Sequence, residues 1–284
     1  LTPEAHKLLA IMTLVALWWI TEPIPIPVTS LLGPTLCVVF GVVKMKEAFA
    51  AFANPMIFLF MGGFMIAKAM MGLLPATAQV SGSIEMGGRR IVGATDADIA
   101  DLRGRYVGMV FQNPAAALNP VMTVAQQIGL PLYLHYDLTA AERAERIRVM
   151  LAKVGLDEDV LRKYPHELSG GQQQRVGIAT ALVTSPHLII ADEPTTALDS
   201  ITQRQIVGLL TSLVDDAGAS MLFITHDFAV LHHATTRCYV LERGGIVESG
   251  ATADLLASPH TGQAIRLVEA ARELSLTTKE SDRV

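Results

Sequence analysis

The sequence has few charged residues for its length, and the deficit is confined to one end. Of the 284 residues, 17% are charged and 6% are aromatic, whereas soluble domains usually contain about 25% charged residues. Residues 1–80 carry 7 charged side chains with a net charge of +1, and residues 81–284 carry 42 with a net charge of −6. We therefore expect a membrane-like part followed by a part that resembles a soluble domain.

The sequence also has few cysteines and no excess of basic residues. The first feature excludes a disulfide-stabilised fold, and the second argues against nucleic-acid binding. Cys37 and Cys238 are the only cysteines and lie in different parts of the chain, which excludes a disulfide framework. The formal net charge is −5, and no basic stripe is present. We therefore expect no nucleic-acid partner.

Three uncharged stretches in the first part predict two or three membrane helices. They span residues 8–21, 24–43 and 48–67. A crossing helix needs about 20 apolar residues, so the second and third stretches are long enough and the first is short. The alternative is a set of buried helices in a soluble core. We favour the lipid bilayer as partner, because two such long runs in close succession are difficult to bury in a core.

After residue 80 the pattern changes to alternating strands and helices. Three short apolar runs predict buried strands at 188–191, 221–225 and 239–241. Helical segments at 201–214 and 229–234 separate them. This alternation predicts an α/β fold with a doubly wound sheet, and a helical subdomain is expected to be inserted at about 115–183.

The run Ser169-Gly170-Gly171-Gln172 precedes a helical segment at 176–183. Ser169 can cap that helix, and the glycines allow backbone N–H groups to approach an anion closely. A helix N-terminus also favours phosphate through its free N–H groups and its dipole. The alternative reading of these residues alone is an ordinary turn before a helix.

Acidic side chains follow the predicted strand at 188–191. Asp192 and Glu193 stand side by side at its carboxyl end, where ligands bind in open α/β sheets. An aspartate there can hold Mg²⁺ through water while the adjacent carboxylate polarises an attacking water molecule. The acidic pair alone is equally typical of a solvated turn.

Gln112 and His226 each follow another predicted strand. His226 could meet a terminal phosphate at the end of its strand, although a single histidine is more often structural. Gln112 lies in a loop, and by itself it carries no information.

Taken in order, these motifs resemble the nucleotide-binding subunit of ATP-binding cassette (ABC) transporters, over about residues 70–260. The resemblance implies that Gln112 is the glutamine that senses Mg²⁺ and the membrane partner. It also implies a signature that closes on ATP held by an opposite subunit, and this signature is formed by Ser169, Gly170, Gly171 and Gln172.

The same resemblance implies the remaining site residues. Asp192, together with Gln112, is expected at the Mg²⁺ ion, and Glu193 is expected to be the catalytic base. Asp199 corresponds to the residue that contacts the dimer partner, and His226 corresponds to the switch histidine. The implied cofactors are therefore ATP and Mg²⁺.

Residues 111–124 resemble the subfamily that serves dipeptide, oligopeptide and nickel importers. This resemblance implies two kinds of protein partner: a second nucleotide-binding subunit, in a homo- or heterodimer, and transmembrane permease subunits. It also implies a location at the inner membrane of the cell, with the cassette region on the cytoplasmic face.

The first part resembles another family. Residues 18–36 and 52–70 are similar to the opening helices of divalent anion:sodium symporters, which carry sulfate or dicarboxylates. That family places its substrate and sodium in Ser-Asn-Thr hairpins, and no such tripeptide occurs in this sequence. We expect a symporter-like fragment at 1–70, a C-terminal part of an ABC nucleotide-binding domain at 71–284, and a junction near Ala69-Met70.

The sequence contains no Gly-Lys dipeptide. A P-loop, GxxxxGK[ST], is expected upstream of Gln112, because its backbone amides and lysine hold the phosphates. We therefore expect an incomplete P-loop NTPase-type sheet and a chain that is an ATPase by resemblance but inactive alone. The alternatives are a non-catalytic half that acts in a partner's site, a fragment of a sodium-coupled symporter, or a chimera with no evolved function.

Overall fold

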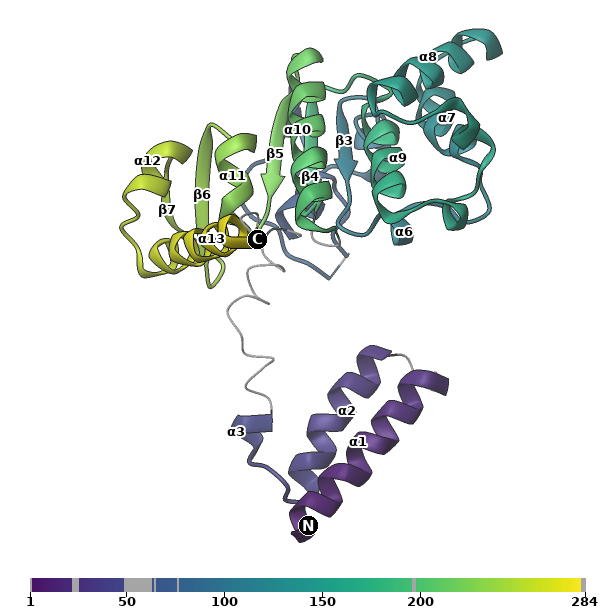
Figure 1. Ribbon diagram of the computed structural model, residues 1–284. Helices are drawn as coiled ribbons and strands as arrows, with labels where there is room; N and C mark the ends of the chain where they lie inside the picture. Colours follow the sequence, from purple (N-terminus) through teal and green to yellow (C-terminus); the bar gives the residue numbers. More distant parts are fainter. Residues whose placement is uncertain are drawn as a thin grey trace. The chain divides into compact units, whose positions relative to one another are not determined.

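The computed structural model describes residues 2–21, 26–48, 63, 65–75, 77–195 and 198–281. The chain divides into two compact units, Leu1–Phe58 and Leu59–Val284 (Figure 1). The junction near Ala69-Met70 concerns the two sequence resemblances rather than this structural division, and it stays a prediction.

The first unit is built on a pair of helices. α1 (Pro3–Thr21) packs against α2 (Ile26–Val39), and the short α3 (Met45–Ala48) follows. Gly33 allows the close approach of the pair, because a Cβ atom there would lie 3.3 Å from Cγ2 of Val15.

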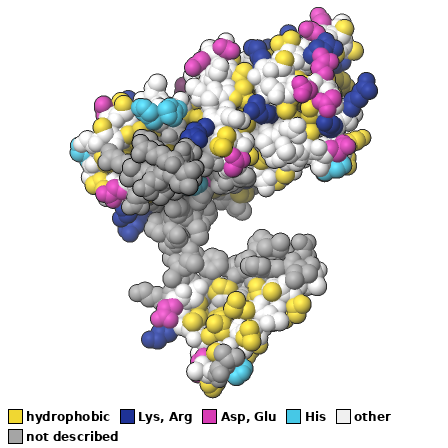
Figure 2. All heavy atoms as spheres, in the orientation of Figure 1, with side chains coloured by type: hydrophobic (Ala, Val, Ile, Leu, Met, Phe, Trp, Pro, Cys, Tyr) yellow, Lys and Arg dark blue, Asp and Glu magenta, His cyan; other side chains and the backbone are white. Residues whose placement is uncertain are grey.

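The structure does not support the predicted membrane helices. α1 has 19 residues but holds Glu4 and Lys7 near its start, and α2 has only 14 residues. Within the part of the chain that the structure describes, no helix is both long enough and apolar enough to cross a bilayer. Most of the predicted third span, 48–67, lies outside the described residues. Figure 2 shows apolar side chains gathered over α1 and α2, and the exposed ones include Leu9, Met12 and Leu17.

The second unit contains a parallel sheet, as predicted. Its strands are β3 (Val107–Val110), β4 (Leu188–Asp192) and β5 (Ser220–Ile224), in the order β3-β4-β5. β4 is the central strand and is almost wholly buried, which explains its continuous apolar sequence. The α/β fold class is thereby confirmed.

The two faces of the sheet are covered by different segments. Ile189 and Ala191 pack into a core with helical segments from both before and after β4 in the sequence, within 118–183 and 206–214. Ile190 points to the opposite face, into a second cluster with Ala67 and Met71. Alternate residues of one strand therefore serve two cores, as the two-residue period of a strand requires.

The helical region predicted at about 115–183 is present. Its elements are α6 (Pro114–Ala117), α7 (Val124–His135), α8 (Ala140–Lys153), the 3₁₀ turns η2 (Glu158–Arg162) and η3 (Pro165–Glu167), and α9 (Gly170–Leu182). Each of the three longer helices begins with a capping box, in which a Thr or Ser side chain and a Glu or Gln side chain three residues later bond each other's backbone N–H. Local sequence thus fixes where these helices begin.

The predicted strand at 239–241 forms, but it does not join the parallel sheet. It lies in β6 (Arg237–Glu242), which pairs antiparallel with β7 (Gly245–Ala251) in a separate sheet. The cause is the two-residue turn between them, because Arg243 and Gly244 have φ values of 51° and 81°. Positive φ at both central residues is typical of tight hairpin turns.

The remaining elements complete the second unit. A small hairpin joins β1 (Glu85–Met86) to β2 (Arg89–Arg90), and α5 (Asp96–Ile99) follows it. The last helices are α10 (Ser200–Asp216), α11 (Phe228–Ala234), α12 (Thr252–Ala257) and α13 (Gly262–Ser281). Figure 1 shows α10 along β4 and β5, and α11 to α13 around the β6–β7 hairpin.

Candidate functional site

Three of the predicted site residues form one hydrogen-bonded group at the carboxyl end of the parallel sheet. Gln112 Nε2 donates to Glu193 Oε2 at 3.0 Å, and His226 Nδ1 lies 3.0 Å from Glu193 Oε1. The three side chains come from the segments that follow β3, β4 and β5. Parallel strands bring their carboxyl ends to one edge, so residues separated by as many as 114 positions meet there.

Glu193 is held in an unusual backbone conformation. Its φ is 45°, in the left-handed region that non-glycine residues seldom adopt. Its backbone N–H donates to the carbonyl of Ile224 at 2.9 Å, and its side chain is buried. Strain of this kind persists only where the surroundings enforce it, and it is typical of functional sites.

Asp192 lies beside this group with its carboxyl buried at the end of β4. Burial, and secondly the neighbouring charge of Glu193, raise the pKa of Asp192 to about 6. Burial disfavours the charged form, and a like charge nearby adds to that effect. A cation at this position would remove the penalty, so Asp192 fits the predicted role of a Mg²⁺ ligand.

For His226, a hydrogen bond has a larger effect on the pKa than burial has. Its hydrogen bond to Glu193 raises the pKa of the imidazole and outweighs the lowering effect of burial. Protonated His226 would form an ion pair with Glu193. The pair can therefore hold a proton next to the carboxylate that was predicted to be the base.

The signature residues lie at the start of α9. Ser169 caps this helix, as predicted: its Oγ accepts from Gln172 N at 3.3 Å, and Gln172 Oε1 accepts from Ser169 N at 3.0 Å. A Cβ atom on Gly170 would meet nothing within 4 Å, and Gly170 is exposed. The helix start is therefore open to a ligand or a partner.

Asp199 caps α10 and lies close to the signature. Its carboxylate accepts from the backbone N–H groups of Ile201 and Thr202 and, at 2.7 Å, from the Thr202 hydroxyl. These bonds hold the pKa of Asp199 below its usual value. A Cβ atom on Gly171 would lie 3.3 Å from Thr202 Cγ2, so Thr202 links Asp199 to the start of α9. The predicted contact of Asp199 with a dimer partner stays a prediction.

Asp227 is a positioning residue that the sequence interpretation left without a role. It caps α11 by accepting from Ala229 N at 2.9 Å, and its other oxygen accepts from Gln203 Nε2 at 2.9 Å. Its charge also contributes to the raised pKa of His226. An aspartate directly before an apolar helical run is a cap signal that could have identified it.

Among the residues that the structure describes, no group of three or more His, Cys, Asp or Glu side chains is arranged to hold a metal ion. Asp192 and Gln112 were predicted as Mg²⁺ contacts in a site that nucleotide phosphates would complete. Their assignment to the metal therefore stays a prediction.

Comparison with known families agrees with the fold. The model of the ABC transporter family matches residues 64–196, and the citrate transporter family matches residues 16–72. The ATP-binding cassette MJ0796, solved as a dimer in a post-hydrolysis state with ADP and Pi, is 31% identical. It aligns with a TM-score of 0.59 over 66% of this chain and 79% of its own. The fold and these matches thus define an ABC-type ATPase domain.

The chain belongs to the ABC transporter family. It is 43% identical over 202 residues to the peptidoglycan transport ATP-binding protein YejF of Agrobacterium fabrum, covering 70% of this chain and 37% of that protein. It is 41% identical over 194 residues to the oligopeptide transport ATP-binding protein OppF of Escherichia coli, covering 68% and 57%. The chain spans 31% to 60% of the length of the curated relatives it matches.

The two matched families overlap at residues 64–72, a range that includes Ala69-Met70. The N-terminal resemblance is thereby shown at the level of a citrate transporter family. Its finer assignment to divalent anion:sodium symporters stays a prediction.

Proposed function

We propose that this chain is an ATP-binding subunit of an ABC importer for peptides or similar small solutes, and that it is defective in binding ATP in its own site. The similarity to oligopeptide transport ATP-binding proteins supports the peptide class. The observation that carries the proposal is the group formed by Gln112, Glu193 and His226 beside buried Asp192. It is the arrangement expected for activating a water molecule beside a phosphate.

Each side chain of the group has a distinct part in this proposal. Glu193 is placed as the base that would accept the proton of an attacking water molecule if a nucleotide were bound, and Gln112 and His226 fix its two carboxylate oxygens. Asp192 would hold Mg²⁺, which when bound neutralises charge on the phosphates.

The defect rests on what the sequence lacks. Without a Gly-Lys dipeptide, the chain has no P-loop lysine and no adjacent Ser or Thr to hold the phosphates and Mg²⁺. Positioning and charge stabilisation supply nearly all the catalysis of phosphoryl transfer. The chain therefore keeps a base without a means of placing the nucleotide against it.

The open start of α9 favours a role in a partner's site. Ser169 and Gly170 stand exposed at the start of a 13-residue helix. The Ser169 N–H is bonded to Gln172, so the backbone N–H groups of Gly170 and Gly171 in the first turn are the ones that would meet a ligand. In a heterodimer with an intact subunit they would close on ATP that the intact subunit holds. The permease subunits and the membrane location belong to the same proposal.

A second candidate follows from the match to the citrate transporter family at residues 16–72. The chain would then be a fragment of a symporter, or a chimera with no evolved function. Uptake of a labelled dicarboxylate by sodium-loaded vesicles containing the chain would identify the fragment. Absence of both uptake and pairing with an ABC subunit would identify the chimera.

The main proposal is tested by mixing the purified chain with an intact homologous subunit and measuring ATP hydrolysis. Ser169→Arg blocks the start of α9, so we expect a loss of about a hundredfold, comparable to removal of a charge-stabilising contact. Glu193→Gln, which alters only the defective site, is expected to change the rate less than about twofold. Hydrolysis by the chain alone that Glu193→Gln abolishes would contradict the proposed defect.

A further inference from the structure

A polar groove of about 470 Å³ lies at the amino end of the parallel sheet. Tyr106 and His187, which line it, come directly before β3 and β4. The site residues Gln112 and Asp192 belong to the other ends of these strands. Since a strand rises about 3.3 Å per residue, roughly 15 Å of sheet separates the groove from the candidate site. The groove is therefore a separate feature of the second unit.

The wall of the groove is built from fixed rings. The ring centroids of Tyr106 and His187 lie 5.1 Å apart, and the Tyr106 carbonyl accepts from the backbone N–H groups of both His187 and Leu188. A Cβ atom on Gly87 would lie 3.2 Å from the Tyr106 ring, tighter than ordinary contact, and Gly87 has a φ of 56°, so glycine suits the close packing of the β1–β2 turn against the ring. The Tyr136 hydroxyl donates to the Thr184 carbonyl at 3.1 Å. The surroundings therefore hold the rings in place.

The described residues that line the groove include two arginines, Arg89 and Arg105, but only one carboxylate, Asp101. Arg89 pairs with Asp101 at 2.6 Å, and this hydrogen bond is the main cause of the lowered pKa of Asp101. Arg105 contributes to that lowering only as a more distant charge, and it forms no ion pair within 4.0 Å among the described residues. One positive charge is therefore left in excess in the groove, from a guanidinium with several free donors.

Two further polar side chains line the same groove as Arg105. His187 is exposed, so its ring is accessible from the groove. Ser185, also exposed, lies in the turn before His187 and has a φ of 51°. The groove therefore combines the Arg105 guanidinium, the Ser185 hydroxyl group, the His187 imidazole and the aromatic rings of Tyr106 and Tyr136.

We propose that this groove binds a small anion that carries an aromatic ring, such as an aryl phosphate or an aryl carboxylate. The Arg105 guanidinium would bind the anionic group through paired N–H donors, an arrangement that suits phosphate and carboxylate geometry. The ligand ring would pack against His187 and Tyr106 at the offset or edge-on angles that aromatic pairs favour.

The test is a titration of the purified full chain with three probes, followed by NMR of the backbone amides. Phenyl phosphate is expected to bind saturably and to shift the amides of Gly87, Tyr106 and His187. Inorganic phosphate is expected to bind more weakly because it lacks the ring, and phenol is expected not to saturate because it lacks the charge. Arg105→Gln should weaken phenyl phosphate binding about tenfold.

Arg162→Gln is the matched control, because Arg162 is also exposed but lies in η2, outside the groove. It should leave the affinity unchanged. His187→Ala should weaken phenyl phosphate more than inorganic phosphate, since it removes the ring wall and keeps Arg105. The proposal is overturned if phenyl phosphate does not saturate, if both arginine variants weaken binding equally, or if the shifts are confined to Gly170 and Gly171.

Discussion

Two carboxylates of the second unit, Asp192 and Glu248, lie in contrasting surroundings. Burial and a neighbouring acid raise the pKa of Asp192 to about 6. Hydrogen bonds from Thr261 and His260 lower the pKa of Glu248 to about 2. Among the described residues, no positive charge or hydrogen-bond donor offsets the negative charge of Asp192 in setting its pKa. The charge of Glu248 is offset by hydrogen bonds to both of its carboxylate oxygens. A charge that the fold leaves uncompensated is the one that can serve a ligand.

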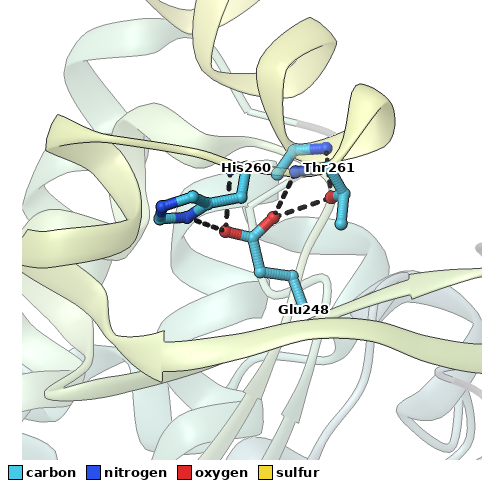
Figure 3. A network of polar contacts seen from close by, with 4 residues as sticks. Glu248, His260 and Thr261 are labelled. Carbon is cyan, nitrogen blue, oxygen red and sulfur yellow. Dashed lines mark hydrogen bonds and ion pairs between the residues drawn. The ribbon is translucent and has the colours of Figure 1, made fainter.

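The surroundings of Glu248 show what compensation requires (Figure 3). One oxygen accepts from the Thr261 hydroxyl at 2.7 Å and from Thr261 N at 2.8 Å. The other accepts from His260 N at 3.0 Å and lies 3.3 Å from His260 Nδ1. Thr261 also bonds Ala264 N, so the group ties β7 to the start of α13. Glu248 is thus a structural residue, in contrast to Asp192.

The largest effect is expected from Asp192→Asn. Removing an uncompensated buried charge should stabilise the fold at pH 7 by about 1–3 kcal/mol, because two pKa units correspond to nearly 3 kcal/mol. Urea unfolding of the full chain at pH 7 measures this. A lower free energy of unfolding in the variant would mean that Asp192 has an ionic partner and would remove the contrast with Glu248.

The pH dependence should have opposite signs at the two carboxylates. The folded-state pKa of Asp192 is raised, so its favourable contribution is complete below about pH 4 and is lost as the pH rises through about 6. The folded-state pKa of Glu248 is lowered, so its contribution is complete above about pH 4.5 and is lost as the pH falls toward 2. Unfolding curves from pH 3 to 8, for the wild type and each amide variant, would show parallel profiles if this assignment is wrong.

A smaller effect is expected from Glu248→Gln, which keeps the shape but replaces charged acceptor oxygens. The variant should lower the melting temperature at pH 7 and increase amide hydrogen exchange at the start of α13. Gln263→Ala is a local control, because Gln263 contacts Arg266 and not Glu248. Equal exchange in both variants would show that Glu248 does not hold α13.

The smallest effect is expected from Thr261→Val. It removes one hydroxyl donor to Glu248 and the long hydrogen bond from Ala264 N but retains the backbone donors to Glu248, so a fall of about 1–3 °C in melting temperature is expected. Thr261→Ser restores the hydroxyl and should recover most of the loss. Failure of the serine variant to recover it would assign the effect to packing of the methyl group.

Much of the candidate site could be predicted from sequence because parallel strands bring their ends together. Once the strands before Gln112, Asp192 and His226 are identified, the meeting of these side chains follows. The capping role of Ser169 follows equally from local sequence. The spatial neighbours of Glu248 could not be predicted, because they lie 12 and 13 residues away and belong to no motif.

The errors have equally physical causes. Uncharged length predicted membrane helices, but among the described residues α2 ends after 14 residues and α1 carries charges near its start. Most of the third predicted span lies outside the described residues. The strand at 239–241 was expected to extend the parallel sheet, but the turn at Arg243-Gly244 returns the chain at once into a hairpin. An apolar run indicates that a strand is buried, whereas the turn that follows the strand decides which strand it pairs with.

The most direct test of the account is ATP binding by the purified full chain, titrated with a fluorescent ATP analogue in the presence of Mg²⁺. The sequence has no Gly-Lys dipeptide, so under the proposed defect the phosphates would lack their main contacts, and we predict no saturation into the millimolar range. Micromolar binding that Asp192→Asn weakens would show that another segment replaces the P-loop. That result would contradict the proposed defect in the chain's own site.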